Sequence, residues 1–141
     1  MARDHYPALY GLLMRTRGTA EETKDKIKDY WASPRPHQVN ENIKNFTEAN
    51  GTNSYPSGHA TKCYTLAIVL GMLLPEKKSQ FLAKAKEMSQ IRVLVGEHFP
   101  SDTKAGQKLA DIIVEKLLTN SEFQKDFKLA KKELREHPAD N

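Results

Sequence analysis

The spacing of apolar residues constrains the fold of this chain more than any other feature of its sequence. Leu109, Ile113 and Leu117, for example, recur at four-residue intervals, which places them on one face of a helix. Similar spacing continues along almost the whole chain, and we find no clear alternation of polar and apolar residues with the period of a β-strand. We therefore predict an all-α fold, a compact bundle of about five to six helices in a single domain over residues 1–141.

Proline, glycine and capping residues divide this pattern into segments. Thr19 is an expected N-cap, because Glu22 three residues later completes a capping box. Ser101 and Asp102 suit the start of a later helix. Residues 37–57 are rich in Asn, Thr, Ser and Gly and predict a long loop, a kind of segment that is often functional in a compact domain. The expected helices cover residues 8–14, 20–31, 58–74, 76–95, 100–119 and 121–136.

Composition argues against several functional classes. The longest apolar stretch, Leu66 to Leu74, has nine residues, whereas a helix that spans a bilayer needs about twenty. Arg3 and Asp4 interrupt the N-terminus, so this chain shows no signal peptide. The net charge of +4 favours anionic ligands in general. Acidic residues interrupt the Lys-rich stripe of the last helix, so we expect no nucleic-acid partner.

Recognisable metal-binding motifs are absent from the sequence. It contains no CxxC, HExxH or EF-hand pattern, and its single cysteine, Cys63, cannot form an internal disulfide. We therefore expect no metal and no cofactor, although phosphate or vanadate would suit the anion site that the next motifs describe.

The first candidate motif is a pair of cations, Lys28 and Arg35, seven residues apart. The planar fork of Arg35 can bind two phosphate oxygens and Lys28 offers a point charge, so the pair could close on one anion. Taken alone, the pattern is much more typical of a solvated helix face, because Lys24 and Lys26 are close by.

The second candidate motif is Ser57-Gly58-His59, at the start of an apolar helix. Free backbone N–H groups at a helix N-terminus bind anions. Ser57 can add a hydroxyl, and Gly58 allows an oxyanion to approach the backbone. His59 would then lie beside the bound anion. An ordinary N-cap with an incidental histidine is the alternative interpretation.

The third candidate motif joins Arg92, His98 and Asp102. A continuous helix would put the first two on different faces, but Gly96 and Pro100 predict a break between them. On such a connection His98 can fold back toward Arg92. Asp102 at the start of the next helix could accept the Nδ1 proton of His98 and leave Nε2 as a nucleophile. A surface His–Asp pair is the alternative.

These motifs together resemble the signature of the type 2 phosphatidic acid phosphatase superfamily, most closely that of the class A bacterial non-specific acid phosphatases. The signature reads Lys-x6-Arg-Pro, then Pro-Ser-Gly-His, then Ser-Arg-x5-His-x3-Asp, and the resemblance covers about residues 24–136. One departure is Ile91, which stands where the family has the Ser before Arg92. Only 27 residues precede Lys28, so we expect a bundle that is reduced at its N-terminus relative to the family.

The resemblance implies a metal-independent acid phosphatase that hydrolyses small phosphomonoesters, with phosphotransferase activity as an extension, in the periplasm or outside the cell. It implies that His98 is the nucleophile, that Asp102 orients it, and that His59 is the general acid. The residues that would hold the phosphate oxygens are Lys28, Arg35, Ser57, Gly58 and Arg92.

Two other functions fit the same residues. A vanadium-dependent haloperoxidase resembles this site with vanadate in place of phosphate, and a catalytically silent phosphate-binding module would keep the anion site without turnover. A helix set this small is expected to leave an apolar face exposed, which a second copy of the chain would cover as a homodimer. Of the aromatic residues near the first motif, we expect Tyr30 and Trp31 to pack in the core.

Overall fold

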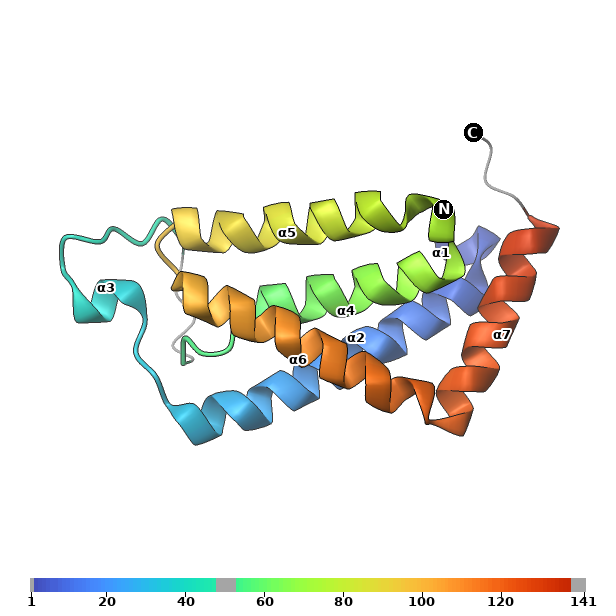
Figure 1. Cartoon of the computed structure of the whole chain (residues 1–141), viewed down its shortest axis with the longest axis horizontal. Helices are drawn as coiled ribbons and strands as arrows, with labels where there is room; N and C mark the ends of the chain where they lie inside the picture. Colours follow the sequence, from blue (N-terminus) through green and yellow to red (C-terminus); the bar gives the residue numbers. More distant parts are fainter. Residues whose placement is uncertain (1, 48–52, 138–141) are drawn as a thin grey trace.

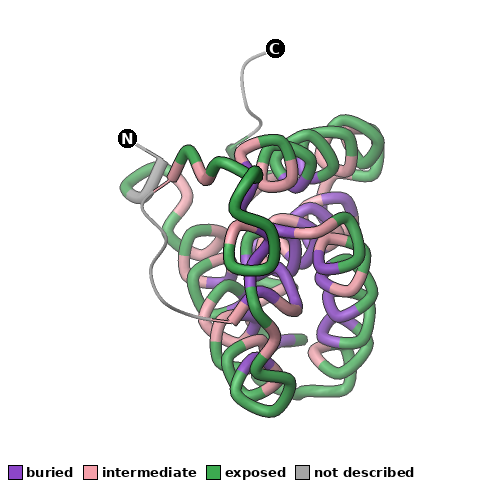
Figure 2. The backbone as a smooth tube through the Cα atoms, turned by 90° about the vertical axis from the view of Figure 1, so that its left-hand side faces the viewer, coloured by how far each residue is buried: buried purple, intermediate pink, exposed green. Residues whose placement is uncertain are grey.

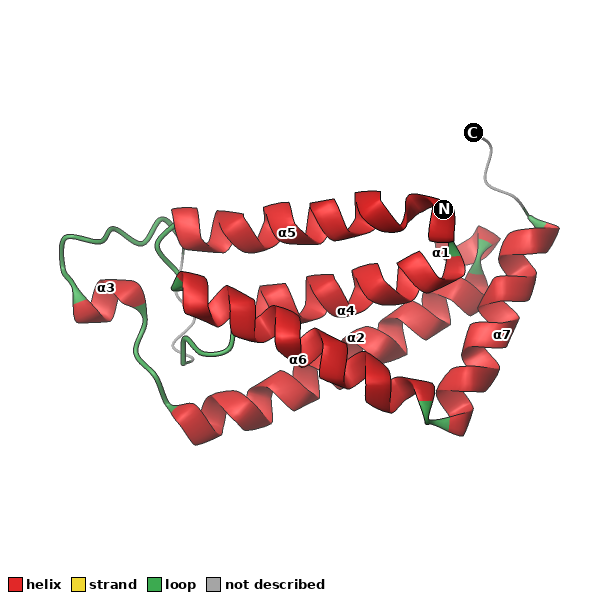
Figure 3. Ribbon diagram, in the orientation of Figure 1, coloured by secondary structure: helices red, strands yellow, loops and turns green. Residues whose placement is uncertain are grey.

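The structure, a computed structural model, describes residues 2–47 and 53–137. Within them the chain is helical and has no strand (Figure 3), so the all-α prediction is confirmed. None of the described helices has the length and apolarity that a transmembrane span requires. The elements are α1 (Ala2–His5), α2 (Pro7–Trp31), α3 (Pro36–Val39), α4 (Gly58–Leu73), a 3₁₀ turn (Pro75–Lys77), α5 (Lys78–Leu94), α6 (Pro100–Leu118) and α7 (Ser121–Glu136).

Helix α4 lies at the centre of the bundle. It contacts α5, α6 and α2, while α7 packs across the N-terminal half of α2 (Figure 1). Its residues are predominantly apolar around the whole circumference, as expected for a helix with neighbours on several sides. Buried residues accordingly gather in the middle of the bundle (Figure 2).

The apolar core is concentrated at the end of the bundle where α7 covers α2. Its buried members come from four helices: Leu12, Val69, Leu73, Val114, Phe123 and Ala130. Nearer the other end of α4, small residues let the helices approach closely. A Cβ on Gly106 would lie 2.7 Å from the Ser57 carbonyl oxygen, so glycine is what allows α6 to pass this near to the start of α4.

The N-terminal segment differs from the prediction of two short helices, 8–14 and 20–31. The structure has one continuous helix, α2, of 25 residues. Thr19 is inside it and caps nothing, because its hydroxyl donates back to the Arg15 carbonyl oxygen at 3.2 Å. This local hydrogen bond competes with the capping role that the sequence favours. The capping-box prediction was wrong.

Three further details correct the sequence analysis. The loop predicted over residues 37–57 contains the C-terminal part of α3, and its residues 48–52 lie outside the described part of the chain. Helix α6 begins at Pro100, as predicted, but its N-cap is Phe99 and not Ser101. Tyr30 and Trp31 are 82% and 59% exposed, because the end of α2 projects beyond the helices that cover its middle (Figure 1).

Candidate active site

Several of the predicted site residues meet at the polar end of the bundle. There the last turns of α2, the first turn of α4 and the α5–α6 connection enclose a cavity of about 230 Å³. Of the predicted residues, Ser57, Arg92 and Asp102 do not line this cavity directly. Its lining residues are Glu21, Lys24, Lys28, Arg35, Gly58, His59, Lys62, Glu97 and His98.

His98 lies at the back of this cavity and is only 3% exposed. Its Nδ1 atom is 3.4 Å from Oδ2 of Asp102. The same oxygen accepts hydrogen bonds from the Ser54 hydroxyl at 2.6 Å and from the Phe99 backbone N–H at 2.9 Å. Two donors and Nδ1 of His98 therefore converge on one carboxylate oxygen, which orients the imidazole. In the tautomer that carries its proton on Nδ1, the lone pair of Nε2 is available for attack.

The electrostatics of this pair favour a neutral imidazole beside a charged carboxylate. Burial lowers the pKa of His98, and the positive charges of Arg35 and Lys28 lower it further, against the opposing effect of the Asp102 hydrogen bond. Burial alone would raise the pKa of Asp102, but the hydrogen bonds from His98, Ser54 and Phe99 outweigh it and lower that pKa. A neutral His98 is the form that can act as a nucleophile.

Lys28 is buried, whereas the nearby Lys26 is exposed. The interpretation of a solvated helix face is therefore wrong for Lys28. Its Nζ donates to the backbone oxygens of Asn53 and, at 3.4 Å, Ser54. Burial, with the neighbouring charges of Arg35 and Lys24, lowers the pKa of Lys28 to about 8.

The two arginines of the predicted site share one internal partner, Glu97. Nη1 of Arg35 lies 3.6 Å from the Glu97 carboxylate and donates to its backbone oxygen at 3.0 Å. Arg92 contacts the other oxygen of the same carboxylate. The backbone reversal predicted at Gly96 brings this about: Gly96 has a φ of 75°, and a Cβ there would lie 2.3 Å from the Lys44 carbonyl oxygen.

The start of α4 forms the remaining side of the site. Ser57 is its N-cap, and its hydroxyl accepts from the Ala60 N–H at 3.3 Å, which bears out a capping role for this residue. His59 in the first turn is exposed and lines the cavity. Desolvation and the surrounding positive charge, led by Arg92 and Lys62, lower the pKa of His59 to about 4.

Comparison with known proteins agrees with this geometry. Residues 8–114 match the family model of the PAP2 superfamily. The chain belongs to this superfamily. It is 30% identical over 132 residues to an acid phosphatase of Zymomonas mobilis. The aligned region covers 91% of this chain and 50% of that protein.

Two further relatives show how broadly the superfamily's substrates vary. A non-specific acid phosphatase of Providencia stuartii is 37% identical over 92 residues, covering 65% of this chain and 37% of its own length. A lipid A 1-phosphatase of Rhizobium johnstonii is 36% identical over 61 residues, covering 43% of this chain and 25% of its own length. The chain thus spans half or less of the length of these relatives.

Sequence reasoning assigned no role to two residues that belong to the site. Ser54 is fully buried and lies 3.4 Å from His98 as well as within hydrogen-bond distance of Asp102. Glu97 binds both arginines. Each is next to a superfamily motif in sequence, and that position was the available signal, although it does not reveal the partner of either side chain. In the described part of the chain, no group of three or more His, Cys, Asp and Glu side chains is arranged to hold a metal.

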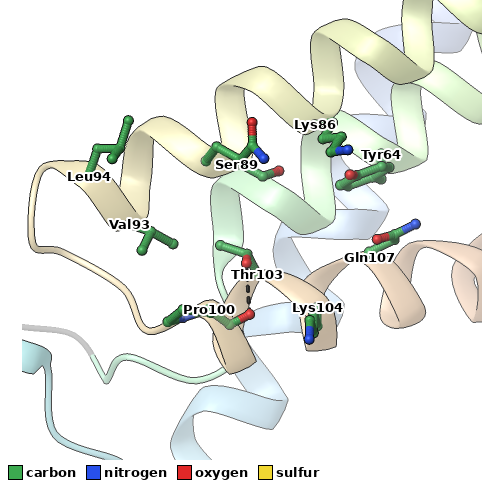
Figure 4. A pocket seen from close by; sticks show the side chains of 10 residues that line it. Tyr64, Lys86, Ser89, Val93, Leu94, Pro100, Thr103, Lys104 and Gln107 are labelled. Atoms are coloured by element: carbon green, nitrogen blue, oxygen red, sulfur yellow. Dashed lines mark hydrogen bonds between the residues drawn. The ribbon is translucent and has the colours of Figure 1, made fainter.

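Two other cavities that are larger than this one share no lining residue with it. One, of about 460 Å³, is lined by aromatic residues, Trp31, Tyr55 and Phe99, beside Asp102. The other, of about 590 Å³, lies between α5 and α6, where Val93 and Thr103 flank it (Figure 4). It holds neither histidine of the site, so its size does not make it the reaction centre.

Proposed function

We propose that this chain hydrolyses phosphomonoesters without a metal ion, through a phosphohistidine at His98. The observation that carries this proposal is the convergence around one cavity: a buried histidine oriented by Asp102 faces the same space as Lys28 and Arg35. The membership of the superfamily supports the same reaction. A cavity of about 230 Å³ has room for a phosphoryl group but not for a large leaving group as well.

In the first step, Nε2 of His98 attacks phosphorus and the bond from phosphorus to the leaving oxygen breaks. His59 gives its proton to that oxygen, so an alcohol leaves. The phosphohistidine carries a positive imidazolium, which the charged Asp102 stabilises through Nδ1. In the second step, His59 takes a proton from water, the hydroxide oxygen bonds to phosphorus, and the bond from phosphorus to Nε2 breaks. If an alcohol replaced water, the phosphoryl group would pass to its hydroxyl.

The cations of the site would stabilise the charge on the non-bridging phosphate oxygens. Lys28 and Arg35 line the cavity, and Arg92 lies behind Glu97. The Ser57 hydroxyl and the backbone N–H groups of the first turn of α4 complete the anion site. Lys28 and the first turn of α4 are already in place, so these two parts of the site need little reorganisation when charge develops.

The protonation of His59 depends on the substrate. Its pKa of about 4 keeps the ring neutral at neutral pH. A bound phosphate dianion would offset the cations that cause this shift and raise the pKa, which prepares His59 as an acid. We therefore expect a bell-shaped pH profile with its optimum on the acid side of neutrality.

A steady-state assay with p-nitrophenyl phosphate, with and without chelator, tests the proposal. We expect turnover that chelator leaves unchanged, and an acid-labile phosphoenzyme after rapid quenching of the reaction. Phosphate binding without any turnover would identify a silent binding module instead. Oxidation of bromide that requires added vanadate, with no phosphatase activity, would identify a haloperoxidase.

Two broader features follow the same proposal. The acid phosphatase relatives favour a location in the periplasm or outside the cell, and fractionation of the source cells tests it.

A homodimer would cover exposed apolar residues of α5, which are Met88, Ile91 and Leu94. Light scattering that gave a mass of 16 kDa at micromolar concentration would contradict the dimer.

A further inference from the structure

Glu97 stands out because it is a buried acid at the centre of a site built for anions. Its carboxylate lies between the guanidinium groups of Arg35 and Arg92, with one oxygen toward each. Its side chain is 9% exposed and lines the cavity together with His98. A carboxylate and a phosphate present similar oxygen pairs to an arginine fork, so Glu97 and a phosphate compete for the same donors.

The charged residues around Glu97 show which positive charges its carboxylate offsets. The cations that line the cavity are Lys24 and Lys28 from α2, Arg35 after α2 and Lys62 from α4, and Arg92 of α5 contacts Glu97. Glu21 on the far side already pairs with Lys24 and Lys62 at 3.0 Å each, and Asp102 is occupied by His98 and Ser54. Glu97 is therefore the acid of the cavity lining that contacts both arginines, and Asp102 adds a further negative charge near Arg35.

We propose that Glu97 is an internal competitor of phosphate, which holds Arg35 and Arg92 and helps to expel inorganic phosphate after each turnover. This rests on the proposed phosphatase function. Substrate binding requires that the Glu97 carboxylate give up at least one arginine, and its return favours product release. Glu97 would thus set how tightly the site holds any phosphate group, which makes it a determinant of affinity.

The first test replaces the charge and keeps the size, with Glu97→Gln. Calorimetric titration with inorganic phosphate at neutral pH should show binding about tenfold tighter than for the wild type, a change of about 1.4 kcal/mol. The Ki of phosphate as a product inhibitor and the KM for p-nitrophenyl phosphate should fall in parallel. The matched control is Glu87→Gln, which removes one negative charge from an exposed pair with Lys84 on α5 and should leave phosphate affinity unchanged.

The direction of the change separates competition from a positioning role. If Glu97 served only to hold the arginines in place, Glu97→Gln would bind phosphate more weakly, and that result or an unchanged affinity would overturn the inference. If the wild type binds phosphate and Glu97→Gln binds it no more tightly, this inference fails and the proposed function stands. If neither protein binds phosphate, the proposed function fails as well.

Thermal unfolding provides a second measurement. It also tests the inference if the variant does not fold without phosphate. Without Glu97 the two guanidinium groups face each other with no acid between them, which destabilises the empty protein. Phosphate should therefore raise the melting temperature of Glu97→Gln, and of Glu97→Ala, more than that of the wild type. A variant that is unfolded without ligand should refold as phosphate is added. If the variant stayed unfolded at a phosphate concentration that stabilises the wild type, the inference would be contradicted.

Discussion

The two ends of the bundle bury different kinds of side chain. At the α7 end, Leu12, Val69 and Phe123 fill the interior with apolar side chains. At the other end, Lys28, Glu97 and His98 are just as buried but are held by hydrogen bonds and ion pairs. Helix α4 spans both ends, and its buried residues change from Thr61 near the site to apolar residues at its C-terminal end.

This difference indicates how the molecule divides stability from chemistry. Apolar burial stabilises a fold by the area that is removed from water. A buried charged group contributes only if every partner is present, because an unpaired one is costly. Substitutions at the α7 end should therefore lower stability with little effect on turnover, whereas substitutions at the site end should lower turnover and cost stability only where they leave a buried charge unpaired. The following experiments test that division.

The largest expected effect is the loss of turnover in His98→Ala. Without the nucleophile no phosphoenzyme can form, and we expect kcat on p-nitrophenyl phosphate to fall by a factor of about 10⁴ or more. The melting temperature should change little in comparison. His37→Ala, at a histidine of α3 that does not line the cavity, is the control. A trapped phosphoenzyme in His98→Ala would disprove the assigned nucleophile.

His59→Ala should have a smaller effect that depends on the leaving group. For alkyl phosphates, which need a proton donor, we expect kcat to fall by a factor of about 10² to 10⁴. For p-nitrophenyl phosphate, whose phenolate leaves readily, the fall should be much smaller. Equal losses on both substrates would show that His59 does not donate the proton.

Phe123→Ala tests the apolar end. The ring is buried and lies beside Phe127, with 5.9 Å between the ring centroids, so its removal should lower the free energy of unfolding by about 3–5 kcal/mol. Urea unfolding measures this, and kcat at 25 °C should stay within about twofold of the wild type. The control is Phe46→Ala at an exposed loop position. A large loss of kcat in folded Phe123→Ala would break the division between the two ends.

Ser54→Ala tests whether Ser54 positions the catalytic pair. It removes the 2.6 Å hydrogen bond to Asp102, so we expect kcat to fall about tenfold and the pKa of Asp102 to rise. The acid limb of the pH profile should move to higher pH, a change that a purely structural role would not cause. Ser89→Ala is the control, because that buried hydroxyl bonds only to the Ala85 carbonyl oxygen of its own helix.

The smallest expected effect is the pH dependence of stability in the absence of phosphate. The pKa of His59 is about 4 when folded and 6.5 ordinarily, so between these values the unfolded chain binds a proton that the folded chain does not. Stability should therefore fall as the pH is lowered from about 6.5 to about 5, before most carboxylates titrate. His98 acts in the same direction. Melting curves of His59→Gln should show a shallower slope, and an unchanged slope would contradict the shifted pKa.

Much of the site could be predicted because its parts are local in sequence. Asp102 follows His98 by four residues, and the helix start between them brings the two side chains together. Ser57 caps α4 for the same kind of reason, since the cap and its partner Ala60 are three residues apart. Interactions over such short distances depend mainly on backbone conformation, which residue type strongly influences.

Other contacts could not be predicted because they join distant segments. Ser54 reaches Asp102 across 48 residues, and Arg35 meets Glu97 across 62. Neither pairing has a sequence pattern, since it depends on how α2, α4 and α6 pack. The continuity of α2 was also open, because a threonine such as Thr19 can either cap a helix or bond back to its own turn.

The amino-acid sequence by itself determined the helical character of this protein and the identity of its reactive groups, because periodicity and side-chain chemistry are properties of short segments. Only the tertiary structure decided which cations are buried, which serine supports Asp102, and that Glu97 bridges the two arginines. Those properties depend on desolvation and on distances between remote segments, and packing alone sets both.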